Sequence, residues 1–141
     1  MGVPSECRAG VAEILTYKPY FENVKDDEIC RIHTDELAED GTMPVTSLLY
    51  RNPILGFIED AYVANILEPK YIDIMNAEMN GEIELEVMIY GLEQASYQLT
   101  MSVLTCIIRQ EQYCQGLWEI ATKEKWFLKI LERLEVLMEE E

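Results

Sequence analysis

The stretch QASYQLTMSVLTCIIRQEQYCQGLWEIA, residues 94–121, decides the fold of this chain. Its first fifteen residues carry no charge, and apolar side chains cover nearly every side of a helix built from them. A helix of this kind is packed on several sides, so we expect residues 94–121 to form a buried central helix. The uncharged run is shorter than the roughly 20 residues that span a bilayer, which predicts burial within protein.

Apolar residues at helical spacing mark further segments. Residues 54–66 follow the i, i+3, i+4, i+7 pattern, and residues 126–138 form one apolar stripe, with Thr122 as the predicted N-cap. Shorter helices are predicted at residues 7–20, ending at Pro19, and at residues 70–79. We therefore expect a mainly α-helical fold, a compact single domain over residues 1–141 with about five or six helices around the buried central helix.

Two segments leave alternatives open. Residues 82–91 alternate like a strand, but Leu85 and Leu92 also fit helical spacing with Asn80 as N-cap, and the helix is preferred. A two-residue hairpin turn starting at Asn80 would mix apolar and charged side chains on each face. Residues 29–45 contain an alternating run before a turn signal, so a short strand pair and an irregular loop fit equally well there.

The chain of 141 residues is strongly acidic, with 27 acidic against 11 basic side chains and a formal net charge of −16. The excess is spread over both halves, −7 in residues 1–70 and −9 in residues 71–141. Such a charge repels polyanions, so direct binding to nucleic acid or to an anionic membrane is disfavoured, and a basic protein is the expected partner. The sequence opens without the basic and apolar regions of a secretory signal, which favours a cytoplasmic protein with reduced cysteines.

Two groups of acidic residues are candidates for a surface that binds such a partner. On a strand, Glu82, Glu84 and Glu86 would project from one face at intervals of about 6.6 Å and imitate a row of phosphates, whereas on a helix they would scatter. A face that is merely solvated is the alternative interpretation of both groups. The second group lies in a loop-like part of the chain and consists of Asp26, Asp27 and Glu28, followed by Asp35, Glu36, Glu39 and Asp40.

Polar and charged residues follow the uncharged run directly, from Arg109 to Trp118. On a continuous helix, Arg109 and Tyr113 share a face, Glu111 lies on another, and Gly116 admits a close approach to the backbone. One interpretation is a network of ion pairs that fixes the packing of neighbouring helices. The other is a ligand or partner site in which Arg109 grips a carboxylate and Trp118 stacks. The candidate residues of that site are Arg109, Glu111, Tyr113, Gly116 and Trp118.

Patterns typical of catalysis or metal binding are lacking in the sequence. His33 is the only histidine, and together with Cys30 it supplies half of a zinc site at most. Nothing local positions His33 as a base for Cys30 or Cys114. Gly-rich phosphate loops, serine-centred elbows and helical zinc motifs do not occur. We predict no catalytic residue, no metal and no cofactor, and a non-enzymatic protein is favoured over an enzyme.

The segment from Arg109 to Trp118 resembles the C-terminal signature of a bacterial and phage family catalogued as domain of unknown function 6508. The typical pattern there is Arg-x-Glu-Arg-aromatic-x-Asp-Gly-x-Trp, followed by a helix that ends in Leu-Glu-Arg-Leu. This chain has Gln112 and Gln115 where the family has Arg and Asp, which weakens any charge-dependent activity of the pattern. Other residues in the family's order are Tyr20, Phe21, Asp40, Gly41, Thr42, Met43, Pro44, Phe57, Ile58, Tyr62, Tyr71, Leu131, Glu132, Arg133 and Leu134.

The resemblance implies a compact, mainly helical domain of the kind found in phages and mobile elements, and it implies no established activity. Together with the charge, it favours an acidic interaction protein, encoded by a phage or mobile element, that binds a basic surface of a partner. Inhibition of a bacterial defence nuclease such as a CRISPR effector is the most specific form of this hypothesis. The alternative is a small-ligand-binding domain or minor enzyme with its site around Arg109, Glu111, Tyr113 and Trp118.

Overall fold

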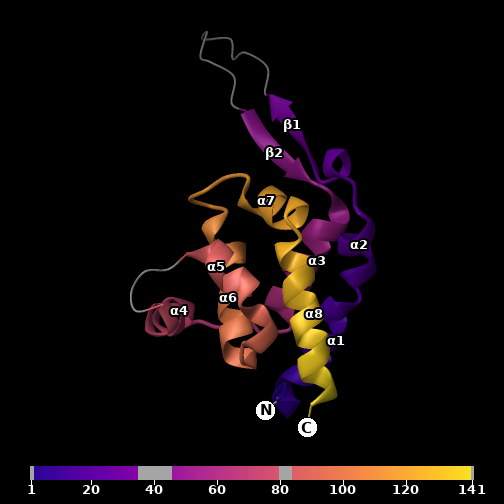
Figure 1. Cartoon of the computed structure of the whole chain (residues 1–141). Helices are drawn as coiled ribbons and strands as arrows, with labels where there is room; N and C mark the ends of the chain where they lie inside the picture. The colour runs from indigo at the N-terminus through magenta and orange to yellow at the C-terminus, as the bar shows by residue number, and fades with distance from the viewer. Residues whose placement is uncertain (1, 35–45, 80–83, 141) are drawn as a thin grey trace.

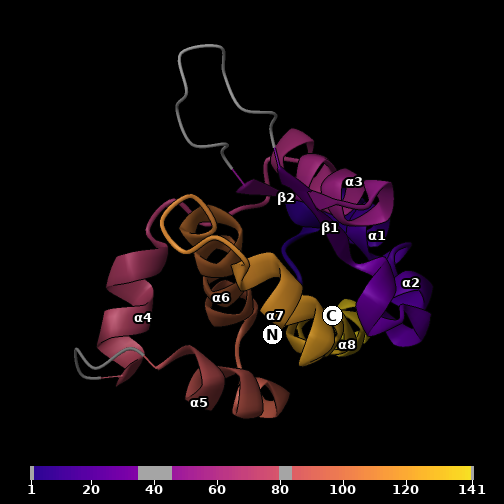
Figure 2. The ribbon, with the colours of Figure 1, turned by 90° about the horizontal axis from the view of Figure 1, so that it is seen from above.

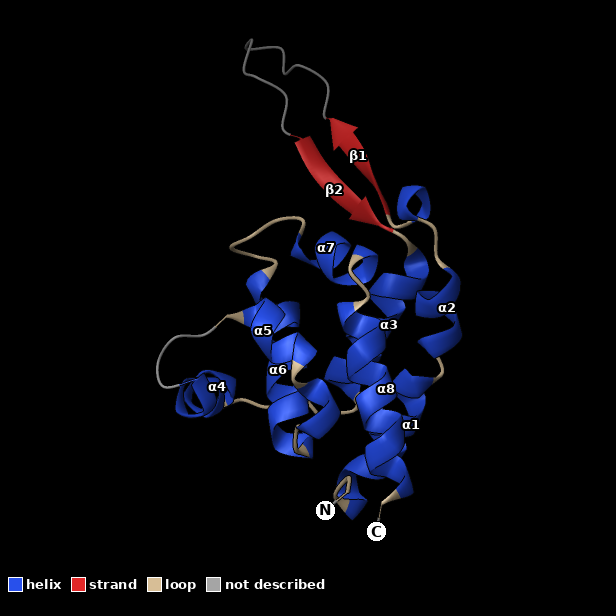
Figure 3. Ribbon diagram, viewed as in Figure 1, coloured by secondary structure: helices blue, strands red, loops and turns tan. Residues whose placement is uncertain are grey.

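Helices make up most of the protein, as predicted (Figure 3). The computed structural model describes residues 2–34, 46–79 and 84–140. These residues form eight α-helices: α1 (Arg8–Leu15), α2 (Lys18–Asn23), α3 (Asn52–Val63), α4 (Tyr71–Met79), α5 (Leu85–Tyr90), α6 (Tyr97–Gln110), α7 (Leu117–Lys123) and α8 (Trp126–Glu139). The 3-10 turns η1 (Ser5–Cys7), η2 (Asp26–Glu28) and η3 (Leu92–Gln94) and the strands β1 (Cys30–Thr34) and β2 (Thr46–Tyr50) complete the described elements.

The helices are arranged as a bundle around α6 and α8 (Figures 1 and 2). Viewed from above, α4, α5 and α6 lie on one side and α1, α2 and α3 on the other, with α7 and α8 between the two groups. Helix α8 contacts α1, α2, α5, α6 and α7, so it joins both groups. The strand pair lies at one end of the molecule and the two chain ends at the other (Figure 1).

The core is formed by the apolar faces that the helical spacing predicts. In α6, side chains such as Met101, Leu104 and Ile107 are buried, which confirms the buried central helix. The apolar stripes predicted for residues 54–66 and 126–138 are confirmed in α3 and α8. Phe21, Phe57 and Phe127 are fully buried and pack with ring centroids 5.0 to 5.4 Å apart, so three helices meet in one aromatic cluster.

The buried hydroxyls of Thr100, Ser102 and Thr105 in α6 are hydrogen-bonded within the core. Thr105, which is fully buried, donates from its hydroxyl to the carbonyl of Met101 (2.6 Å) and accepts from the amide of Glu68 (2.9 Å). A buried hydroxyl without such partners would cost stability, so these bonds let an uncharged but partly polar helix lie in the interior. In the described part of the chain, no helix is long and apolar enough to cross a membrane.

The prediction of one helix over residues 94–121 is wrong, because the chain turns between α6 and α7. The amides of Tyr113 and Cys114 both donate to the carbonyl of Gln110, at 2.9 and 2.8 Å, which closes a tight turn. Gly116 then adopts φ 99°, in the left-handed region that glycine occupies without a steric penalty. The faces predicted for Arg109 and Tyr113 on one continuous helix therefore do not exist.

Two predicted helix boundaries are also wrong. Pro19 lies in the first turn of α2, where a missing N–H is tolerated, and does not end a helix. Thr122 lies inside α7 and donates to the carbonyl of Trp118 (2.8 Å), so it does not cap the last helix. Helix α8 begins at Trp126, after Lys125 with φ 64°.

The two segments for which the sequence left alternatives open, residues 82–91 and 29–45, have different outcomes. Within residues 82–91, α5 is helical as preferred, but it begins at Leu85, and the proposed N-cap Asn80 lies outside the described residues. Strands β1 and β2 pair antiparallel, with Cys30 opposite Tyr50 and Thr34 opposite Thr46. Only β1 falls within residues 29–45, where the alternative strand pair was placed, and the partner strand comes after that range.

Arg8 fastens the start of the described chain to the end of α8. Its guanidinium donates to the carbonyls of Val3 (3.3 Å), Glu140 (3.4 Å) and Met138. The carbonyls at the C-terminus of a helix lack partners within it and carry partial negative charge, so a cation there is stabilising. The side chain of Arg8 thereby joins α1 to α8, which are at opposite ends of the sequence.

Tyr17 supplies a pH-dependent contribution to stability. Its hydroxyl donates to Asp60 Oδ2 (2.7 Å), and this hydrogen bond, more than burial, raises the pKa of Tyr17 to about 12. Because the folded value lies above the unfolded value of about 10, the contribution is complete below pH 10 and is lost as pH rises through 12. Tyr17→Phe should lower the free energy of unfolding by about 0.5–1.5 kcal/mol at pH 7 and flatten its decline above pH 10, measured by urea denaturation. Tyr113→Phe, at a side chain that is 78% exposed, should change neither.

Candidate functional site

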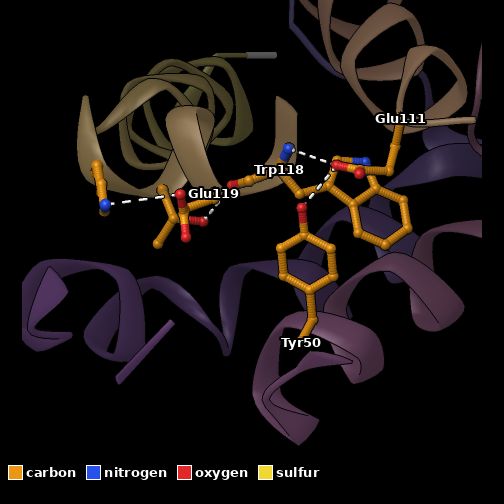
Figure 4. Close-up of polar contacts among 6 residues, drawn as sticks. Tyr50, Glu111, Trp118 and Glu119 are labelled. Carbon is orange, nitrogen blue, oxygen red and sulfur yellow. Dashed lines mark hydrogen bonds and ion pairs between the residues drawn. The ribbon is translucent and has the colours of Figure 1, made fainter. Parts of the chain in front are cut away.

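Glu111 connects three elements at the end of the bundle that carries the strands (Figure 4). Its Oε1 accepts from the hydroxyl of Tyr50 (2.7 Å), the last residue of β2, and from the amide of Trp118 (2.8 Å) in α7. Its Oε2 accepts from the amide of Gly116 (2.7 Å). Hydrogen bonds to an ionised group are among the stronger ones in proteins, so this half-buried carboxylate holds the turn after α6 closed.

Glu111 lies where its carboxylate can accept hydrogen bonds from the amides at the start of the next helix, α7. The first amides of α7 have no partner within the helix, and those of Gly116 and Trp118 are satisfied by the carboxylate. A negative charge at this end of a helix also interacts favourably with its dipole. The left-handed conformation of Gly116 aims both amides at one side chain. The close approach to Gly116 that the sequence predicts is thus made by Glu111 of the same chain.

Trp118 packs against the other two elements of this junction. Its indole Nε1 donates to the carbonyl of Ile107 (3.1 Å) in α6, and its ring lies 5.2 Å from that of Tyr50 at an angle of 51°. Such tilted aromatic pairs contribute beyond their buried area. The indole therefore anchors α7 to α6 and to β2.

A hollow of about 550 Å³ opens beside this junction. Arg109 is exposed at its edge, and its guanidinium carbon lies 5.7 Å from the ring centre of Tyr71, within cation–π distance. The lining residues are Tyr62, Ile108, Arg109, Glu111, Gln112 and Trp118. One cation, one carboxylate, one amide and two aromatic rings thus face a space large enough for a small molecule.

The structure brings together part of the predicted site. Arg109, Glu111 and Trp118 line the hollow, whereas Tyr113 is 78% exposed and, like Gly116, is not among the lining residues. Sequence reasoning missed Tyr50 and Tyr62, which come from β2 and α3. Tyr62 fits the apolar pattern of residues 54–66, so the sequence carried no sign that its ring is 49% exposed at this site.

The predicted acidic surface is described only in part. Glu84 and Glu86 are exposed at the start of α5, while Asp35, Glu36, Glu39, Asp40 and Glu82 lie outside the described residues. Residues 85–90 are helical, which is the preferred alternative, so the row of carboxylates at intervals of about 6.6 Å that a strand would give is not formed there.

Groups of three or more His, Cys, Asp or Glu side chains that could hold a metal ion do not occur among the residues described. Cys7, Cys106 and Cys114 are free thiols, and Cys114 is exposed in the turn before Gly116. Burial raises the pKa of the Cys106 thiol, which keeps it protonated and unreactive.

Comparison with known proteins identifies the family. The sequence pattern of a family of unknown function, DUF6508, matches residues 8–140. The chain belongs to the DUF6508 family. No significant similarity to a curated protein or to a solved structure was found.

The geometry gives the signature of this DUF6508 protein a structural meaning. The Glu, Gly and Trp of the signature are Glu111, Gly116 and Trp118, which bond to one another across the turn between α6 and α7. In the Leu-Glu-Arg-Leu motif, Leu131 and Leu134 are buried, and Arg133 Nε donates to the carbonyl of Ala95 (2.8 Å). Both motifs therefore stabilise helix junctions, and Arg109 is the charged residue of the first motif that remains exposed.

Proposed function

We propose that this DUF6508 protein is a non-enzymatic interaction protein that binds a basic surface of a partner protein. The observation that carries the proposal is how the chain uses its few cations. Arg8 donates to three main-chain carbonyls, Lys125 to the carbonyl of Phe21 (3.0 Å) and Arg133 to that of Ala95. Carbonyls are neutral, so these hydrogen bonds place the cations in the fold and do not themselves neutralise a carboxylate.

Other cations lie against aromatic rings. The ammonium of Lys129 is 4.4 Å from the ring centre of Tyr90, and Arg109 lies over Tyr71. Ion pairs among the described residues include Lys18–Glu135 (3.0 Å) and Lys123–Glu119 (3.6 Å). Since 27 acidic residues face 11 basic ones, most of the negative charge is left unbalanced at the surface.

The densest group of exposed carboxylates in the described chain lies where α2 leads into β1. Glu22, Asp26, Asp27 and Glu28 are all exposed within seven residues, and we call them the α2–η2 acidic surface. The exposed Lys25 lies among these carboxylates, so the surface carries a net charge of −3, and the neighbouring Lys125 donates to the carbonyl of Phe21 in α2. A field of this sign attracts a basic protein at long range and speeds its association.

Affinity capture and a matched pair of variants test the proposal. The immobilised protein is incubated with nuclease-treated bacterial lysate at low and at moderate salt, and the retained protein is purified for binding measurements. We expect a protein of basic isoelectric point whose affinity falls with salt. Neutralising the surface with Asp26→Asn, Asp27→Asn and Glu28→Gln together should weaken binding by about tenfold or more.

The control variant removes the same charge from another part of the surface. It combines Glu84→Gln, Glu86→Gln and Glu93→Gln, which are exposed on α5 and η3, and Figure 2 shows α5 on the side of the bundle away from α2. Binding should weaken less than about threefold in this control, because distant charges are screened. Recovery of no basic protein at either salt concentration overturns the proposal, and equal weakening by both variants overturns the α2–η2 surface as its site.

The most specific form of the proposal is inhibition of a bacterial defence nuclease, such as a CRISPR effector, by a cytoplasmic protein of phage or mobile-element origin. Small size, the charge of −16 and the absence of recognisable catalytic motifs support it. Nucleases carry basic grooves for their substrates, which an acidic protein can occupy. A captured nuclease should lose cleavage activity in proportion to the added protein.

A second candidate function is binding of an aromatic carboxylate in the hollow beside Glu111. The specific observation is that Arg109 lines this hollow together with the rings of Tyr62 and Trp118. Benzoate should then shift the NMR signal of the Trp118 indole N–H, and Arg109→Gln should abolish the shift. Because Arg109 is exposed, this variant is expected to fold.

A further inference from the structure

A second hollow, of about 360 Å³, lies between α8 and the segment that joins α5 to η3. Helix α8 faces it with Lys129, Glu132, Arg133 and Val136, spaced as i, i+3, i+4 and i+7. This stripe is separate from the core stripe of α8, whose side chains are buried. One face of α8 is therefore packed and the next one lines an open space.

Two cations of α8 are held at this hollow. Arg133 is half-buried, and its Nε donates to the carbonyl of Ala95, which fixes the plane of the guanidinium and leaves the two terminal nitrogens with four further N–H donors. The Lys129 ammonium lies over the ring of Tyr90 at 4.4 Å. Like charges one helical turn apart disfavour each other, so a carboxylate between them is stabilising.

Carboxylates and an apolar floor complete the lining. Glu93 of η3 and Glu132 of α8 are exposed at the hollow. Its accessible apolar surface comes from Tyr90 and Val136, which are 67% and 46% exposed and lie over the buried Ile89 and Leu92. The two carboxylates oppose any ligand with more than one negative charge, and they offer acceptors to an ammonium group. The hollow is thus lined by cationic, anionic and apolar groups. Its volume is at the lower end of the range for ligand sites.

We propose that this hollow binds a free α-amino acid with an apolar side chain. The ligand carboxylate lies between Lys129 and Arg133, its ammonium between Glu93 and Glu132, and its side chain on the apolar floor. A free amino acid carries an ammonium and a carboxylate on one α-carbon, and each meets side chains of opposite charge in the lining. A ligand with only one of these charges meets partners for half of the charged side chains. The proposal is independent of the partner-binding function and stands if that function fails.

NMR titration of the full chain with L-phenylalanine tests the proposal. The amide signals of residues 89–95 and 129–136 should shift together, with a dissociation constant on the order of 1 mM, as expected for about twelve ligand atoms. 3-Phenylpropanoate lacks the ammonium, phenethylammonium lacks the carboxylate, and N-acetylphenylalanine amide lacks both charges. Each should bind about tenfold more weakly or worse.

Two variants with matched controls locate the site. Lys129→Met and Glu132→Gln keep the Arg133–Ala95 bond and should each weaken binding by about fivefold or more. Lys123→Met and Glu139→Gln make the same charge changes outside the hollow and should leave the affinity unchanged. Dispersed amide spectra of all four variants verify the fold. The proposal is overturned by an absence of shifts, by equal binding of 3-phenylpropanoate, or by equal effects of variants and controls.

Discussion

Replacing Phe57 by alanine is expected to lower the free energy of unfolding by about 3–5 kcal/mol. The ring is fully buried and lies 5.0 Å from Phe21, 5.2 Å from Phe127 and 5.8 Å from Tyr17 between ring centroids. Its removal leaves a cavity where α2, α3 and α8 meet, and the surrounding rings cannot fill it without losing their edge-to-face geometry. Urea denaturation at 25 °C measures the difference.

Leu55→Ala is the control for Phe57→Ala, because Leu55 lies on the same helix with a side chain that is 44% exposed. It should cost less than about 1 kcal/mol. Since small domains are stable by only about 5–15 kcal/mol, the Phe57 variant should unfold at a clearly lower urea concentration than this control. A loss below about 2 kcal/mol for Phe57→Ala would show that the aromatic cluster is not the centre of the core.

Glu111→Ala is expected to lower the free energy of unfolding by about 2–4 kcal/mol, although Glu111 contributes nothing to the apolar core. The reason is that the amides of Gly116 and Trp118 and the hydroxyl of Tyr50 lose their acceptor together. Amide hydrogen exchange at Gly116 and Trp118 should accelerate more than exchange in α6, because the start of α7 opens first.

Two further variants distinguish the effect of the Glu111 carboxylate on stability from the effects of its neighbours. Gln112→Ala changes the exposed neighbour of Glu111 and should shift stability by less than about 0.5 kcal/mol. Tyr50→Phe removes one of the three donors, and its effect should shrink when Glu111 is already alanine, since the two side chains share one hydrogen bond. Additive effects of Tyr50→Phe and Glu111→Ala would contradict the direct bond.

The helices that could be predicted from the sequence are those whose buried residues recur at a regular spacing along the chain. In α3 and α8 the buried residues, such as Ile54, Phe57, Ile130 and Leu134, recur at the period of the helix, so composition and spacing alone identify them. The burial of α6 in the core was equally predictable. The residue at which α6 ends was not, because the residues after Arg109 still contain good helix formers.

Helix α6 is ended by hydrogen bonds that cannot be inferred from the spacing of apolar residues. Gly116 is compatible with both a close helix contact and a left-handed turn, and only the position of the Glu111 carboxylate decides between them. The start of α8 is a similar case. Lys125 adopts a positive φ in spite of its side chain, and its ammonium reaches the carbonyl of Phe21, more than a hundred residues earlier.

The candidate site was partly predictable for the same reason. Arg109, Glu111 and Trp118 lie within ten residues, so the end of one helix and the start of the next bring them together. Tyr50 and Tyr62 reach the junction from β2 and α3 by tertiary packing, for which local patterns carry no signal. The predicted row at Glu84 and Glu86 depended on a strand, and the helical start of α5 removes it.

The contacts that α1 and α2 make with α8 have a consequence for how the protein is synthesised. A ribosome releases the N-terminal helices at about 5–20 residues per second, long before α8 exists. Until then Phe21 lacks the ring of Phe127, and Arg8 lacks the carbonyls of Met138 and Glu140. Helix α1 and the ring of Phe21 can already pack on α3, so the first half of the bundle can form early and α8 then closes it.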